Sequence, residues 1–164
     1  MKKIKVAFTD THDHLAAFFN HLLGMRYNVE IVKDENPDFL IFGDKNFGVD
    51  NLNFDKDKVT KIFYTGENQR PEDYECHYAI TFDHNYYGWH YRLPLFVIYL
   101  WALKNVHKTK YDKNYILNPT IEKKYDFCSF VVKNGAPPER NEFFDQLSQY
   151  KKIDSGGPHK KNVV

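Results

Sequence analysis

The stretch KIFYTGENQRPE, residues 61–72, joins an apolar strand-like run to a glycine, a carboxylate, an amide and a proline. The apolar run begins at residue 59, as VTKIFYTG, and glycine and proline are residues that end strands and form turns. An earlier segment, PDFLIFG at 37–43, is likewise a continuous apolar run closed by glycine. Continuous apolar runs are typical of central strands in a parallel sheet, because such strands are buried on both faces. The two segments therefore predict a parallel α/β fold.

Three further strands and two helices are predicted around these runs. The strands span 4–8, 27–32 and 78–83. Between the first two strands, apolar side chains recur at helical spacing up to Gly24, and a cap is expected among Thr9, Asp10 and Thr11. The second helix, at 93–107, is strongly apolar and is expected to cover the sheet.

The C-terminal part of the sequence predicts a second, smaller unit. A polar, lysine-rich stretch at 109–125 is expected to be a linker. Residues 126–164 then predict a strand at 126–132, a helix that begins near Pro138, and a short strand toward Ile153. The helix places three apolar side chains on one face: Phe143, Phe144 and Leu147. A β-α-β fragment of this size cannot close a core of its own, so we expect the beginning of an incomplete second domain.

The composition is that of a globular protein without the net positive charge that favours nucleic-acid binding. Hydrophobic residues make up 42% and charged residues 27%, and the net charge is +1, so we expect no nucleic-acid partner. No apolar run is long enough for a transmembrane segment or a secretory signal. The two cysteines form no disulfide framework or zinc pattern. We therefore expect a cytoplasmic protein, with peripheral association with a membrane as the alternative.

Polar residues directly follow each predicted strand. In an open parallel sheet, ligands bind beyond the carboxyl ends of the strands, so these residues are candidates for a site. They are Thr9-Asp10, Asp44-Lys45, Thr65 to Asn68, Asp83-His84 and Lys133 to Gly135. Several are acids, which suits general base catalysis or the binding of hydroxyl-rich ligands. Helix caps and turns use the same residue types, so each also has a purely structural interpretation.

Other kinds of site fit the sequence less well. Asp10, Asp44 and Thr65 imitate a phosphoacceptor receiver domain, but AITFDH at 79–84 lacks the lysine and proline which that family has after its last strand. Four of the histidines, at positions 12, 14, 84 and 90, lack zinc-binding spacing, so no metal site is expected. Cys128 lies within a predicted apolar strand and is expected to be a buried small side chain. The aromatic content of 17% is expected to fill the core, with stacking on sugar or base rings as the alternative.

Two blocks of the sequence resemble the family 10 glycosyltransferases, the α-1,3/1,4-fucosyltransferases. The first comprises IFYTGENQRPE, YAITFD and YRLPL, within 61–95, and the second is FCSFVVKNGAPPERNEFFDQLSQYKKIDSGG, within 126–157. The blocks occur in the order that the family has, whereas residues 1–60 match it only in general character. The resemblance implies a GT-B fold of two Rossmann-like domains. The acceptor-side domain would span 1–108 here, and residues 126–164 would begin the GDP-fucose domain.

The resemblance also implies a reaction and the residues that serve it. In an inverting single displacement, a hydroxyl of a glycan acceptor attacks the anomeric carbon of fucose and GDP leaves, without a cofactor. Glu67 matches the acid of the family's TGEN motif and is the expected general base, and Asn68 would orient it or touch the sugar. Arg140 matches the arginine at the start of the donor domain's first helix, where a guanidinium suits a diphosphate. Asn134 matches the asparagine of the preceding loop and is expected to bind substrate with it.

The sequence departs from the family beyond DSGG at 154–157. There the family continues with a Phe-Glu-Asn-Ser stretch and a Gly-Tyr…Thr-Glu-Lys motif, which hold most of the nucleotide, and this sequence has neither. We therefore expect a truncated fucosyltransferase that binds GDP-fucose weakly on its own. The alternatives are a non-catalytic glycan-binding remnant, or one half of a split enzyme completed by a separately encoded C-terminal half.

Overall fold

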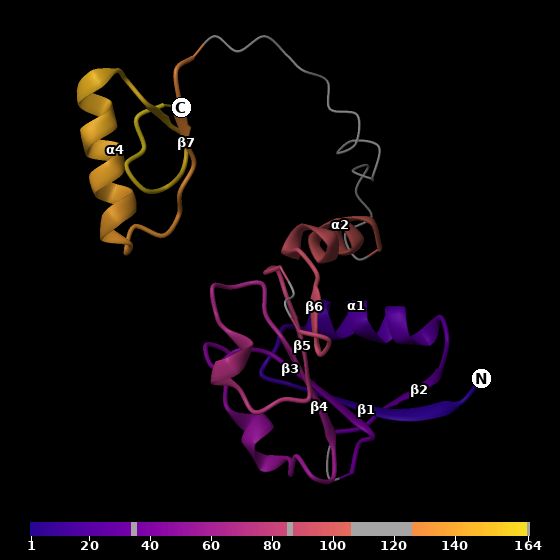
Figure 1. The fold of residues 1–164 in the computed structure, drawn as a ribbon. Coiled ribbons are helices and arrows are strands. Elements are labelled where there is room, and N and C mark those ends of the chain that lie inside the picture. The colour runs from indigo at the N-terminus through magenta and orange to yellow at the C-terminus, as the bar shows by residue number, and fades with distance from the viewer. Residues whose placement is uncertain (34–35, 85–86, 106–125, 164) are drawn as a thin grey trace. The chain divides into compact units, whose positions relative to one another are not determined.

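The computed structural model describes residues 1–33, 36–84, 87–105 and 126–163 and divides the chain into two compact units. Unit 1 spans Met1–Pro119 and unit 2 spans Thr120–Val164. Each unit combines strands and helices (Figure 1). The predicted linker at 109–125 lies outside the described residues, so the predicted domain limits stay a prediction.

Unit 1 is built on a six-stranded sheet in which all neighbouring strands are parallel. The strands are β1 Lys3–Thr9, β2 Asn28–Ile31, β3 Phe39–Phe42, β4 Thr60–Tyr64, β5 Tyr78–Thr81 and β6 His90–Arg92. The predicted parallel α/β sheet is confirmed, with its strands where the apolar runs lie. The edge strand β6 was not predicted, because its sequence HYR contains no apolar run.

The strand order is β2-β1-β3-β4-β5-β6, so the direction of the chain across the sheet reverses at β1. Strand β1 pairs with β2 on one side and with β3 on the other. Connections leave the carboxyl ends of β1 and β3 in opposite directions, which opens a crevice between those ends. In open α/β sheets this topological switch point is the usual place for a ligand.

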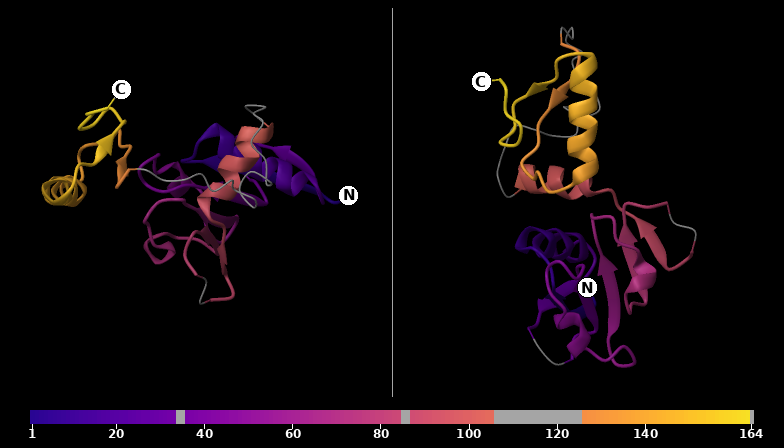
Figure 2. Two further views of the ribbon diagram at one scale, coloured as in Figure 1. Left: turned by 90° about the horizontal axis from the view of Figure 1, so that it is seen from above. Right: turned by 90° about the vertical axis from the view of Figure 1, so that its left-hand side faces the viewer.

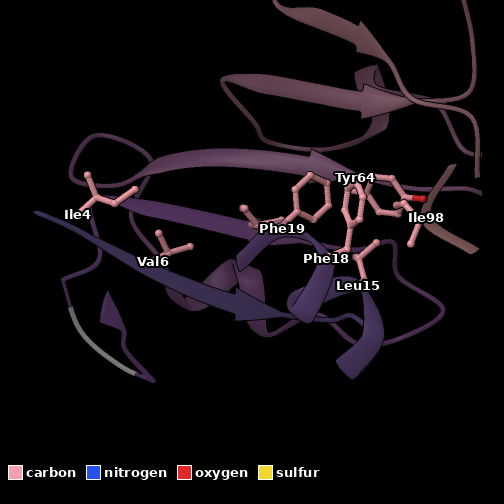
Figure 3. Close-up of a cluster of buried hydrophobic side chains, with 8 residues drawn as sticks. Ile4, Val6, Leu15, Phe18, Phe19, Tyr64 and Ile98 are labelled. Carbon is pink, nitrogen blue, oxygen red and sulfur yellow. The ribbon is translucent and has the colours of Figure 1, made fainter. Parts of the chain in front are cut away.

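The two faces of the sheet are covered differently. Helices α1, Asp13–Gly24, and α2, Leu95–Asn105, lie on one face, and the short 3₁₀ helices η1, Asp50–Asn53, and η2, Pro71–Asp73, lie with loops on the other (Figure 1). The buried cluster on the helical face consists of Ile4, Val6, Leu15, Phe18, Phe19, Ile41, Tyr64 and Ile98 (Figure 3). The cluster on the other face consists of Ala7, Leu40, Phe42, Val59, Phe63 and Ala79. Burying each large apolar side chain stabilises the fold by about 1.5–3 kcal/mol, which explains why β3 is apolar on both faces and why β4 is apolar there apart from the buried Lys61.

Helix α1 begins without the side-chain cap that the sequence predicts. Its N-cap is His12, which makes no capping hydrogen bond. Asp10 has a φ of 53°, and its carboxylate accepts hydrogen bonds from the backbone N–H of Asp50 (2.9 Å) and of Asn51 (2.8 Å). Asp10 therefore caps η1, and the prediction that Thr9, Asp10 or Thr11 caps α1 was wrong. The reason is a contact across 40 residues, which local sequence does not reveal.

Unit 2 is a β-α-β structure of β7 Ser129–Phe130, α4 Pro138–Tyr150 and β8 Asp154–Ser155, with β7 and β8 parallel. Figure 2 shows α4 beside these strands, and Phe144 of α4 is buried with its ring 4.7 Å from that of Phe130. The predicted strand at 126–132 was too long, because only Ser129 and Phe130 pair with β8. Cys128 precedes β7 and is half-buried, so the burial predicted for this side chain was also wrong. Of the apolar side chains predicted on one face of the helix, Phe144 is buried and Phe143 is 63% exposed.

Candidate functional site

Glu67 lies just beyond the carboxyl end of β4, where two hydrogen bonds fix its backbone. The Glu67 N–H donates to Thr65 Oγ1 (3.0 Å), and the Thr65 hydroxyl donates to Asp44 Oδ2 (2.7 Å). Thr65 and Asp44 are each only 1% exposed, so water does not compete for the bond between them. The Glu67 side chain itself is exposed and makes no hydrogen bond or ion pair with the described residues. Strands β3 and β4 thus hold the backbone, while the carboxylate remains available to a ligand.

Glu67 lines a hollow of about 80 Å³ at the switch point of the sheet. The walls come from the turn after β1, the ends of β3 and β4, and the first turns of α2: Thr11, His12, His14, Leu15, Gly43, Asp44, Phe47, Tyr64, Thr65, Gly66, Glu67, Leu95 and Tyr99. One water needs roughly 10–15 Å³ of such volume, so the hollow holds roughly five to eight waters. That is the size of a site for a small ring rather than for a whole nucleotide sugar.

Two glycines permit the close contacts behind the hollow. A Cβ on Gly43 would lie 2.0 Å from the backbone oxygen of Asp10, where β1 and β3 meet. A Cβ on Gly66 would lie 2.7 Å from Leu95 Cδ1, where β4 meets α2. At Gly43 the close neighbour is backbone, so packing requires glycine there, whereas at Gly66 the close neighbour is the end of the Leu95 side chain, which would have to turn aside to admit a Cβ.

Aromatic rings form one side of the hollow. The rings of His12 and His14 stack with centroids 5.3 Å apart, and the His12 ring meets Phe47 edge-on at 4.4 Å. The His14 ring lies 6.0 Å from that of Tyr99. Apolar ring surfaces beside a carboxylate and hydroxyl groups suit a ligand that presents both C–H and O–H groups.

Tyr64 lines the same hollow, and its buried hydroxyl has no hydrogen-bond partner among the described residues. The residue is 5% exposed, and its ring packs 5.5 Å from that of Phe19 (Figure 3). Burial raises the pKa of Tyr64 well above its usual value, and the negative potential of Tyr99 and Glu67 raises it further. The hydroxyl is therefore protonated at neutral pH and is a hydrogen-bond donor. The sequence did not predict this role, because Tyr64 ends an apolar run and resembles a core residue.

Asn68 lies in a separate polar group. Its side-chain carbonyl accepts a hydrogen bond from Arg70 Nη2 (3.0 Å), and Arg70 Nη1 pairs with Asp83 Oδ2 at 2.5 Å. These side chains connect the turn after β4 to the residues that follow β5. The structure therefore pairs Asn68 with Arg70, and its role in binding substrate stays a prediction.

Asn134 and Arg140 come together in unit 2. Arg140 Nη1 donates to the backbone carbonyl of Asn134 (3.2 Å), and the Asn134 side-chain carbonyl accepts from the Ala136 N–H (2.9 Å). Both residues are exposed, at the loop before α4 and in its first turn. Their predicted contact with a diphosphate stays a prediction.

The residues that the structure describes hold no group of three or more His, Cys, Asp or Glu side chains suited to a metal ion. His90 is buried, and its Nε2 lies 2.8 Å from Thr81 Oγ1, which gives it a structural partner. In the described ranges, every helix is too short or too polar to cross a membrane.

Comparisons with known proteins agree with this fold. The family "Alpha-(1,3)-fucosyltransferase FucT N-terminal domain" matches residues 4–99, which include Glu67 and the other residues that line the hollow. The protein named Alpha-(1,3)-fucosyltransferase FucT from Helicobacter pylori is 27% identical over 164 aligned residues, which cover 83% of this chain and 34% of that protein.

Solved structures share the fold at low identity. A crystal structure of an α1,3-fucosyltransferase superposes with a TM-score of 0.68 at 21% identity and covers 99% of this chain and 56% of that chain. A crystal structure of α1,3-fucosyltransferase with GDP-fucose gives 0.65 at 20% identity and covers 55% of that chain. This chain thus spans 34% of the curated relative's length and 56% of the solved chain's. Because the family match extends over more than half of the sequence, this chain belongs to the family of the α-(1,3)-fucosyltransferase FucT N-terminal domain.

Proposed function

We propose that this chain supplies the acceptor-binding side and the general base of an inverting fucosyl transfer from GDP-fucose to a glycan hydroxyl. The observation that carries the proposal is the position of Glu67. Its backbone is anchored through Thr65 to a buried aspartate, and its free carboxylate lines a hollow at the switch point of a parallel sheet. The position also lies within the residues that match the family.

The proposed reaction is a single displacement at the anomeric carbon of fucose. The acceptor hydroxyl oxygen forms a bond to that carbon as the bond from the carbon to the diphosphate oxygen breaks. GDP leaves with the electron pair of the broken bond, and Glu67 takes the proton of the acceptor hydroxyl. The reaction therefore needs no cofactor, because its only reactants are the acceptor and the donor substrate GDP-fucose.

On the donor side, Asn134 and Arg140 are the residues of this chain that we propose for the diphosphate. Arg140 lies in the first turn of α4, where a guanidinium and a helix N-terminus both favour an anion. A segment outside this chain would complete the donor pocket in a GT-B arrangement, either in one longer polypeptide or as a separately encoded half. The lengths support this proposal, since the chain spans 56% of a solved relative.

Transfer assays on the completed protein test the proposal. With both halves present, Glu67→Gln should lower kcat by a factor of roughly 10²–10⁴, the usual contribution of a positioned general base. Glu72→Gln is the matched control, because Glu72 is an exposed acid in η2 that does not line the hollow. Near-normal kcat in Glu67→Gln would refute the role of Glu67 as the base.

A second candidate function is glycan binding without transfer. It is favoured by the fact that all residues lining the hollow belong to unit 1, so an acceptor could bind without a donor pocket. Calorimetry on the full chain separates the two functions. Weak binding of GDP-fucose by the chain alone, with turnover after addition of the second half, supports an enzyme. Glycan binding without turnover in the completed protein supports the binding module.

A further inference from the structure

The Tyr64 hydroxyl is buried and has no hydrogen-bond partner among the described residues. Buried polar side-chain atoms usually have a hydrogen-bond partner, because leaving one unpaired destabilises the folded state. The next residue, Thr65, both donates and accepts a hydrogen bond through its hydroxyl. Tyr64 has no such partner among the described residues, although its ring is tightly packed. Phenylalanine would fill the same space without an unpaired hydroxyl.

The position of this hydroxyl indicates what satisfies it. Tyr64 and Glu67 line the same hollow and are three positions apart in the sequence. One is a protonated hydroxyl that can donate, and the other is a carboxylate that can only accept. A sugar hydroxyl has both an acceptor oxygen and a donor proton, so it can bridge such a pair.

We propose that Tyr64 is a ligand-binding residue of the hollow. Its hydroxyl donates a hydrogen bond to the oxygen of a sugar hydroxyl, and the Glu67 carboxylate accepts a hydrogen bond from the proton of that same hydroxyl. This inference rests on the proposed function, because it takes a glycan to be the ligand of the hollow. Together the two groups select a hydroxyl-bearing ring and orient the hydroxyl that Glu67 deprotonates. The aromatic side of the hollow, with Phe47 and Tyr99, meets the C–H surface of the ring.

The hydroxyl oxygen is shielded from solvent in the free protein, so the ligand reaches it when exposed side chains move aside. Tyr99, which is 52% exposed, and Glu67 are two of the exposed side chains that line this hollow. Rotation of exposed side chains takes picoseconds to nanoseconds, so this opening does not require a change of fold.

The test uses the full chain and variants that remove single groups. Methyl β-glycosides of glucose, galactose, mannose and N-acetylglucosamine are titrated at millimolar concentrations, and the amide resonances of Gly66 and Glu67 report binding. Tyr64→Phe should weaken binding roughly five- to tenfold, the effect of one hydrogen bond between uncharged groups. Tyr150→Phe is the matched control, because this tyrosine is 81% exposed and lies in unit 2. It should bind as the wild type does.

Urea unfolding of the same variants distinguishes a ligand-binding role from a structural one. If the hydroxyl serves a ligand, Tyr64→Phe should have an unchanged or higher unfolding midpoint together with its weaker binding. A lower midpoint would overturn the inference, because it would mean that the hydroxyl has a structural partner such as a buried water. Wild-type affinity in Tyr64→Phe would also overturn it.

A parallel titration of Glu67→Gln separates this inference from the proposed function. Weak binding by Glu67→Gln with normal binding by Tyr64→Phe refutes only the role of Tyr64. Weak binding by Tyr64→Phe with normal binding by Glu67→Gln keeps Tyr64 as a sugar ligand and counts against Glu67. A wild-type chain that binds none of the four sugars refutes both.

Discussion

Replacing Thr65 by valine should destabilise unit 1 by about 2–4 kcal/mol. Valine keeps the shape of threonine but removes the hydroxyl that links Glu67 to Asp44. A hydrogen bond to a charged group contributes about 1.5–3 kcal/mol, which applies to the 2.7 Å bond to the Asp44 carboxylate. The 3.0 Å bond from the Glu67 N–H adds about 0.5–1.5 kcal/mol. Asp44 would keep only the Asn46 N–H as a donor among the described residues.

Urea unfolding followed by tryptophan fluorescence measures this change in unit 1 alone. The chain has two tryptophans, Trp89 and Trp101, and both lie in unit 1. With a slope of about 2 kcal/mol per molar urea, the midpoint should fall by about 1–2 M. Hydrogen exchange gives a second measurement, because the Glu67 amide loses its acceptor and should exchange faster.

Thr65→Ser is the matched control for this prediction. Serine keeps the hydroxyl and loses one methyl group, so the expected loss is only about 1 kcal/mol. The Glu67 amide should stay protected in this variant. The reasoning fails if Thr65→Val unfolds within about 0.5 kcal/mol of the wild type, the scatter of neutral surface changes. It also fails if serine destabilises as much as valine.

Three further predictions concern packing, a buried charge and pH. Gly66→Ala should lower stability by about 0.5–1.5 kcal/mol, the cost of turning Leu95 out of its rotamer, because the new Cβ would lie 2.7 Å from Leu95 Cδ1, and a double-mutant cycle with Leu95→Ala should remove this loss. Lys61 is fully buried and its Nζ lies 3.2 Å from Glu75 Oε2. In urea unfolding, Lys61→Met should leave the free energy of unfolding unchanged or raise it, whereas Glu75→Gln should lower it by about 1–3 kcal/mol. A large loss of stability in Lys61→Met would contradict this. Burial raises the pKa of Cys76 from 9.0 to about 11, so the thiol should react slowly with Ellman's reagent at pH 8. Because the pKa of Cys76 is higher in the folded state than in the unfolded state, the contribution of this thiol to the free energy of unfolding should be fully present below pH 9 and should be lost as the pH rises through about 11. Cys76→Ala should make this decline shallower.

The sheet was predictable from the sequence where burial on both faces imposes apolar residues. Strands β3 and β4 are such segments, and both lie where their runs predict them. Lys61 is an exception within β4. A pattern of apolar residues does not predict that a lysine is fully buried, as Lys61 is beside Glu75. Strand β6 was missed for the opposite reason, because pairing with β5 rather than apolar content makes it a strand.

The candidate site was predictable in part. The sequence placed Glu67 among the candidates because polar residues that follow parallel strands gather at one edge of the sheet, and the structure places Glu67 at the hollow, while its role stays a prediction. The bond between Thr65 and Asp44 joins residues 21 positions apart, so only the folded structure shows that these two strand-end residues act together. Tyr64 was missed because its ring satisfies the apolar pattern, and its hydroxyl becomes informative only when its lack of a partner is seen.

The hollow is assembled from distant parts of the sequence, and this links occupancy to folding. His12 follows β1, Asp44 follows β3, Glu67 follows β4, and Tyr99 belongs to α2. The walls exist together only after these strands have paired and α2 has docked, so an unfolded chain has no corresponding binding surface. A ligand present at 100 times its Kd would therefore stabilise the assembled unit by about 2.7 kcal/mol. A ligand of the hollow would thus also shield unit 1 from proteolysis and aggregation, with a stabilisation that grows as the logarithm of its concentration.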